Sequence, residues 1–217
     1  MAKDTLKGKN SPGLFGVVLL NLAVFYGATQ QDTVLVGDWG ALLKNWRVAV
    51  PVSLGALLVG IVNAQIAPMW KAVLVFWRWP NPLPGSEAFS RHMPTDPRID
   101  GARLASKHGE LPTDPVEQNQ LWYRIYLDVA KKPAVAQAHR AFLFARDYAC
   151  LAAMMVVLLG IAGFIQIPSL GTSLVYFSLL LVQFLVVRQA AKNNGIRFVT
   201  TVLAIDAAKE PKGNVES

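Results

Sequence analysis

The side chains of this chain that could do chemistry are few, and they form no known catalytic pattern. His92, His108 and His139 all fall in one central stretch, and none pairs with another histidine or a cysteine at metal-ligand spacing. A zinc site combining them with Asp96 or Asp114 would require the fold to bring these residues together. The glycine motifs for phosphates, dinucleotides and nucleophilic serines are absent from the sequence. We therefore predict no catalytic residues, no metal site, no cofactor and no enzymatic activity.

The most distinctive cluster of side chains lies in residues 118–126, which read Gln-Asn-Gln-Leu-Trp-Tyr-Arg-Ile-Tyr. Three aromatic rings this close together go too far round a helix for one small core, so Trp122 and Tyr126 should pack inward while Tyr123 stays outside. Aromatic and arginine side chains are enriched where proteins bind one another. We predict a partner-binding or self-association surface of Trp122, Tyr123, Arg124 and Tyr126. Core packing is the alternative for two of the three rings.

Four stretches without a charged residue or a histidine are long enough, or nearly so, to cross a bilayer as helices. They are residues 13–29, 48–68, 148–167 and 169–187. Buried helices of a soluble core are the alternative, but four of them in a chain of 217 residues would lack amphipathic partners. We predict an all-α integral membrane protein with four transmembrane helices as two hairpins and a small cytosolic helical domain between them.

The basic residues orient these spans. Of the 21 Lys and Arg residues, only Lys44 and Arg47 lie between the first and second spans. Basic residues stay in the cytoplasm, so both termini and the central segment should be cytoplasmic, in a bacterial inner (plasma) membrane. The net charge of +7 is then explained by orientation, and no nucleic-acid partner is predicted. The first span has the basic flank of a signal peptide, but Tyr26 spoils the cleavage pattern, so we expect an uncleaved anchor.

Five segments follow from these assignments. They are a cytosolic N-terminus (1–12), a first transmembrane hairpin (13–68), an interfacial helix with the cytosolic domain (69–147), a second hairpin (148–187) and a cytosolic tail (188–217). In the cytosolic domain Thr-Asp-Pro occurs twice, and Asp96 and Asp114 should each cap a helix that begins at the following proline. The first helix should end near His108. The second should run from residue 115 to about 131, and a third should run from about 134 into the third span.

Aromatic and basic residues at the ends of the spans predict contacts with membrane lipid. The short helix after the second span should place its tryptophans in the acyl boundary and its cations toward lipid phosphates; a cytosolic extension bent at Pro68 is the alternative. The interface residues are Trp39, Trp46, Trp70, Lys71, Trp77 and Arg78.

Small and amide side chains inside the spans should link one helix to another. They are Asn21, Ala56, Gly60, Asn63 and Gln183. The spans contain no ionisable residue of the kind that proton- and ion-coupled transporters place in the membrane, which disfavours secondary active transport.

Taken together, these features predict a non-enzymatic inner-membrane anchor, interaction or sensing module. Its cytosolic helical domain should bind a protein partner, such as a co-encoded cytosolic protein, or itself, and we expect a homo-oligomer. The alternative is the subunit of an oligomeric pore or membrane-disrupting effector that the cytosolic domain gates.

Overall fold

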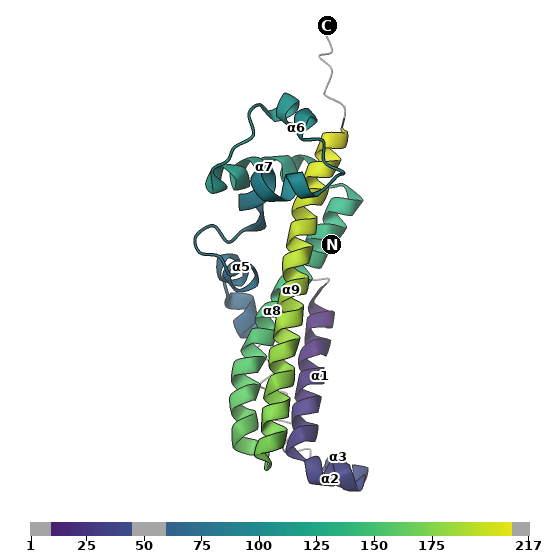
Figure 1. Ribbon diagram of the computed structural model, residues 1–217. Helices are drawn as coiled ribbons and strands as arrows, with labels where there is room; N and C mark the ends of the chain where they lie inside the picture. Colours follow the sequence, from purple (N-terminus) through teal and green to yellow (C-terminus); the bar gives the residue numbers. More distant parts are fainter. Residues whose placement is uncertain (1–9, 45–59, 210–217) are drawn as a thin grey trace. The chain divides into compact units, whose positions relative to one another are not determined.

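The computed structural model describes residues 10–44 and 60–209, and every regular element in these residues is a helix (Figure 1). The chain divides into two compact units. The first unit comprises Met1–Lys71 and Phe144–Gln189, and the second comprises Ala72–Leu143 and Ala190–Ser217. Two long helices therefore contribute residues to both units.

Three helices are long and apolar enough to cross a membrane: α1 (Ser11–Thr29), α8 (Pro133–Gln166) and α9 (Leu170–Ala208). They indicate a multi-pass membrane protein. Four such helices were predicted, and the described residues contain three. Most of the missing span, residues 48–59, lies outside the described residues, while residues 60–65 are helical.

Large apolar side chains on these three helices point outward as well as inward. In water such a surface would be unfavourable, whereas in a bilayer it faces hydrocarbon at no cost. The exposed residues include Leu20, Val24, Val157, Ile161, Ile165, Leu179, Val182 and Val186.

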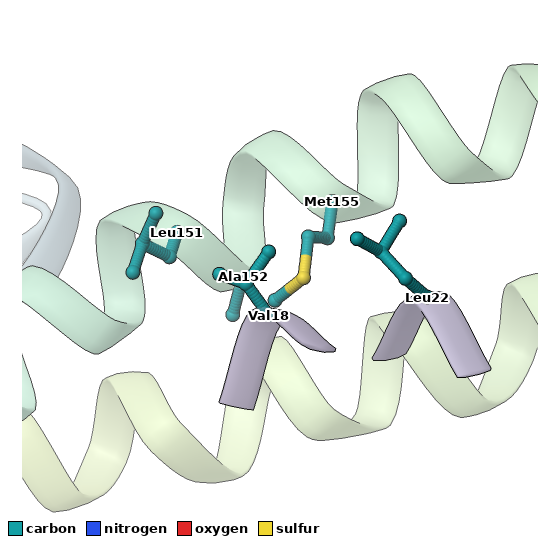
Figure 2. Close-up of a cluster of buried hydrophobic side chains, with 5 residues drawn as sticks. All are labelled: Val18, Leu22, Leu151, Ala152 and Met155. Carbon is teal, nitrogen blue, oxygen red and sulfur yellow. The ribbon is translucent and has the colours of Figure 1, made fainter. Parts of the chain in front are cut away.

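The core of the first unit is formed where α1 packs on α8 and α9. Figure 2 shows Val18 and Leu22 of α1 against Leu151, Ala152 and Met155 of α8. A second cluster joins the far end of α1 to α9, through Phe25, Ile167, Tyr176 and Leu180. Glycines on α8 make room for α9, since a Cβ atom at Gly160 would lie 2.9 Å from the ring of Phe177.

The amide side chains predicted to link the spans have different roles. Gln183 of α9 donates from Nε2 to the hydroxyl of Tyr148 on α8 over 2.9 Å, so this link is confirmed. Asn21 is buried and donates to the carbonyl of Val17 in its own helix, so its link to another helix stays a prediction. Asn63 is buried.

The two small residues predicted with them give no support for close helix contacts. Gly60 is exposed, with open space where a side chain would begin. Ala56 lies outside the described residues. The prediction of a small-residue contact face on this helix is therefore unsupported at Gly60.

Two short helices, α2 (Gln31–Val36) and α3 (Trp39–Lys44), follow α1, and Gly37 between them has a left-handed backbone. Trp39 is largely exposed at the start of α3. Trp46, predicted at the same interface, lies outside the described residues.

The second unit is built from shorter elements that pack on α8 and α9. These are the last residues of α5 (Pro68–Phe76), the turns η2 (Pro84–Glu87), η3 (Ala88–His92) and η4 (Met93–Thr95), and the helices α6 (Gly101–His108) and α7 (Pro115–Val129).

Helix α7 begins as predicted, because the Asp114 carboxylate accepts hydrogen bonds from the backbone of Val116 and Glu117. The cap predicted for α6 is wrong. Asp100 caps this helix by accepting from the Arg103 backbone, whereas Asp96 closes a turn and pairs with Arg98.

Residues 188–217 were predicted to be a tail, but α9 continues without a break to Ala208. Its C-terminal half supplies the core of the second unit with side chains spaced on one helix face. These are Ala191, Phe198, Val199, Val202 and Leu203, all buried. Helix α8 is likewise continuous from Pro133, which confirms the predicted junction of the third cytosolic helix with the third span.

Candidate functional site

The inner face of α7 is anchored by a buried glutamine. The side-chain oxygen of Gln118 accepts hydrogen bonds from the backbone of Phe89 and Ser90 at 3.0 and 3.1 Å, and from the Ser90 hydroxyl at 3.1 Å. Its amide nitrogen donates to the carbonyl of Thr113 over 2.7 Å. Gly85 allows η2 to approach closely, since a Cβ atom there would lie 2.8 Å from Trp122. These contacts fix which face of α7 is buried.

An aromatic cluster completes that buried face. Trp122 stacks on Tyr126 with ring centres 5.8 Å apart and meets the edge of Phe198 at 5.3 Å. The Tyr126 hydroxyl and Nδ1 of His139 are 3.1 Å apart, and His139 stacks on Phe198 at 4.7 Å. Burial raises the pKa of Tyr126, so this phenol stays neutral at pH 7. The cluster confirms that Trp122 and Tyr126 pack inward.

The outer face of α7 carries an apolar stripe. Val116, Tyr123 and Leu127 have 49%, 52% and 56% of their surface exposed. Their spacing of seven and four residues places them on one side of a helix. Trp122 is buried, so of the four predicted contact residues only Tyr123 and Arg124 are fully available to a partner. Val116 and Leu127 were missed, although their spacing from Tyr123 was visible in the sequence.

Charged residues are distributed unevenly along this outer face. Asp114 and Glu117 lie at the N-terminal end, and Lys131 and Lys132 follow the C-terminal end; all four are exposed. The helix dipole favours this layout, because it is positive at the N-terminus and negative at the C-terminus. Arg124 and Asp128, which are also exposed, lie between these two pairs. The N-terminal end of α7 is therefore acidic, and the two lysines that follow its C-terminal end are basic.

A buried ion pair lies in the first unit, where α5 meets α8. Nζ of Lys71 is 3.0 Å from Oδ1 of Asp147, and the two side chains are 2% and 4% exposed. Nη2 of Arg146 also reaches Oδ1, at 3.1 Å. Lys71 was predicted to face lipid phosphates, and its burial corrects that prediction. Trp70 and Trp77, predicted beside it, are exposed.

A second ion cluster surrounds Glu87 in the second unit. Its carboxylate pairs with Arg78, lies 3.5 Å from Nη1 of Arg91 and lies 3.9 Å from Nε2 of His92. Burial lowers the pKa of His92 below 6.5, and the nearby cations Arg78, Arg91 and Lys192 lower it further, against the opposing effect of Glu87. The His92 ring is therefore neutral at pH 7.

A third cluster fixes α6 to the end of α9. His108 donates from Nε2 to Oδ2 of Asp206 over 2.8 Å, and Nζ of Lys107 lies 3.8 Å from the same oxygen. Arg103 donates to the carbonyl of Lys209 over 3.1 Å. The cations of this cluster compensate the charge of the buried Asp206 carboxylate. The sequence analysis predicted that this residue lies in a cytosolic tail.

The three histidines thus lie beside three different groups, namely Glu87, Asp206 and Tyr126, and His92 is buried. Within residues 10–44 and 60–209 there is no group of three or more His, Cys, Asp or Glu side chains placed to hold a metal ion.

Comparison of the chain with protein-family models, with curated proteins and with solved structures finds no match.

Proposed function

We propose that this chain is a membrane-anchored interaction module that works as a homo-oligomer, in which the outer face of α7 binds a second copy. In this proposal the module sits in a bacterial inner membrane with four spans in two hairpins and with the second unit and both termini in the cytoplasm. The module has no catalytic residues and no cofactor.

The observation that carries the proposal is the contrast between the two faces of α7. The inner face is buried through the contacts of Gln118 and the aromatic cluster, whereas the outer face exposes Val116, Tyr123 and Leu127 in one stripe. A helix inside a soluble unit normally turns polar residues to water, and aligned apolar residues there are typical of an interface.

The charge layout favours a second copy as the partner. When two α7 helices pack antiparallel, the acidic end of each lies opposite the basic end of the other. In a dimer with two-fold symmetry this pairing of opposite charges occurs at both ends of the interface. The two apolar stripes then lie against each other in the middle. The stripe is short, but anchoring in one bilayer raises the effective concentration of the second copy, so a small interface suffices.

The test is the mass of the full chain in mild detergent, measured by light scattering. The wild type should be a dimer. Tyr123→Asp with Leu127→Asp should give a monomer, while the matched control Gln137→Asp, at an exposed position of α8, should leave the dimer intact. A wild-type monomer, or a dimer that survives the double change, would refute self-association through α7. A larger ring would favour a pore-forming subunit, and a second protein in the peak would identify a different partner.

Charge reversal tests the antiparallel arrangement. Glu117→Lys alone and Lys131→Glu alone should each weaken the dimer, because each places like charges opposite one another. The two changes together in one chain should restore it. If the combined variant is weaker than either single variant, the helices do not pair in this direction.

A further inference from the structure

In the second unit, two exposed tryptophans flank Arg78, and Arg78 shares one carboxylate with the exposed Arg91. Helix α5 ends at Phe76, and the side chains of Trp77 and Trp79 follow it with 61% and 69% of their surface exposed. Trp77 has φ of 50°, a left-handed conformation that bulky residues rarely adopt. The fold therefore presents an indole outward at a position that is unfavourable for its backbone.

Arg78, between the two indoles, is held in place by three contacts. It pairs with Glu87, it donates from Nη2 to the carbonyl of Leu83 over 3.3 Å, and its guanidinium carbon lies 5.7 Å from the ring centre of Phe76. These contacts fix the position of the Arg78 guanidinium.

Arg91 brings a second guanidinium to the same carboxylate. Its side chain is 66% exposed and reaches Glu87 only at 3.5 Å, so most of its donors face solvent. Because one carboxylate serves two guanidinium groups, a positive charge remains at the surface.

The buried neighbour His92 does not compensate this charge. Its Nε2 has no hydrogen-bond partner among the described residues, and its ring carries no charge at neutral pH. Lys192 adds to the positive field at this ring. The side chains around Glu87 therefore carry a net positive charge.

We propose that Trp77, Arg78, Trp79 and Arg91 form a docking surface for a bilayer that contains anionic phospholipid. The indoles enter the interface between headgroups and acyl chains, and Arg91 binds a headgroup phosphate. Indoles prefer this interface because one edge is polar and the rest is apolar, and guanidinium groups bind phosphate through paired donors. A free anion would satisfy Arg91 but would leave both indoles in water.

The bilayer is the favoured occupant because the same chain carries three candidate spanning helices. These helices tether the second unit to a bilayer, so the bilayer is present at a high effective concentration. The proposal rests on the membrane location given under the proposed function, but not on self-association through α7.

The first experiment locates the indoles. The full chain is reconstituted in nanodiscs, and fluorescence is compared between the wild type and Trp77→Phe with Trp79→Phe. The difference isolates these two of the six tryptophans. Brominated lipid should quench this difference and aqueous acrylamide should not. Quenching by acrylamide alone would overturn the proposal. If brominated lipid quenches no tryptophan of the wild type, the membrane location itself is wrong.

The second experiment tests the anion. Nanodiscs of phosphatidylcholine with phosphatidylglycerol are dissolved in mild detergent, and the lipids that remain on the purified chain are measured by mass spectrometry. Arg91→Gln should lose the enrichment of phosphatidylglycerol and Arg91→Lys should keep part of it. The matched control Arg140→Gln, an exposed arginine on α8, should keep all of it.

Equal loss in Arg91→Gln and in this control would overturn the role of Arg91. Competition by inorganic phosphate that Arg91→Gln abolishes would overturn the bilayer in favour of a free anion. All variants should keep the wild-type mass in detergent, which separates this proposal from self-association.

Discussion

Replacement of Asp147 by asparagine should destabilise the first unit strongly, because it leaves Lys71 as a buried cation without a counter-charge. The two groups are 3.0 Å apart, and their side chains are 2% and 4% exposed. Removing one member of a buried ion pair costs about 3–5 kcal/mol. In a chain of this size each kcal/mol lowers the Tm by about 2–4 °C, so Asp147→Asn should lower it by about 6–20 °C.

The reverse change should cost less. In Lys71→Met the Asp147 carboxylate still accepts a hydrogen bond from Nη2 of Arg146 at 3.1 Å, so it keeps one cation. The double variant Lys71→Met with Asp147→Leu removes both charges and should recover part of the loss, because a buried pair can be replaced by apolar residues of similar volume.

The assay is thermal unfolding of the full chain in mild detergent at one fixed scan rate, since such unfolding is often irreversible. Gln137→Ala, at an exposed position of α8, is the control and should change the Tm little. If Asp147→Asn unfolds at the same temperature as the control, or if Lys71→Met loses more stability than Asp147→Asn, then Lys71 does not depend on Asp147 as its counter-charge.

Three further predictions concern the second unit. Gln118→Leu removes the acceptor of the Phe89 and Ser90 backbone donors and should cost about 1–3 kcal/mol of stability for each donor left unsatisfied. Amide hydrogen exchange of residues 88–92 should become faster, and unchanged exchange would contradict this role of Gln118. The lowered pKa of His92 means that the unfolded chain binds a proton more readily, so stability is complete above pH 6.5 and falls as the pH drops below it. His92→Gln should flatten this part of the pH profile of the Tm, and an unchanged slope would exclude His92 as its cause. Asp100→Ala should cost about 1 kcal/mol through loss of the α6 cap, measured by urea unfolding, and Asp96→Ala should leave the helicity of α6 unchanged.

Local signals made α7 and its buried face predictable. Asp114, Pro115 and the apolar spacing that follows all favour the same helix start, and no distant residue changes the result. At Asp96 and Asp100 two carboxylates were equally able to cap a helix. The choice depends on Arg98, which binds Asp96 and also reaches the hydroxyl of Thr200, about a hundred residues further along the chain.

The charged groups were the least predictable part of the candidate sites. Lys71 lies among tryptophans on a short helix, which favours a lipid-facing cation, and its true partner Asp147 is 76 residues away. The C-terminal half of α9 carried a helical spacing of apolar residues, Phe198, Val199 and Val202. The basic residues on either side of them, Lys192, Arg197 and Lys209, are typical of a solvated tail. Pairing across such distances is decided by the fold and leaves no local pattern in the sequence.

The most direct test of the account is a photocrosslinking scan of α7 in native membranes. A photoreactive amino acid is placed at position 123 or 127 on the outer face, at position 125 on the buried face, and at position 137 on α8. Self-association through the outer face of α7 predicts an adduct of twice the 23.7 kDa chain mass from positions 123 and 127 and none from 125 or 137. Absence of this adduct at 123 and 127, or equal yields at all four positions, would contradict self-association through the outer face of α7.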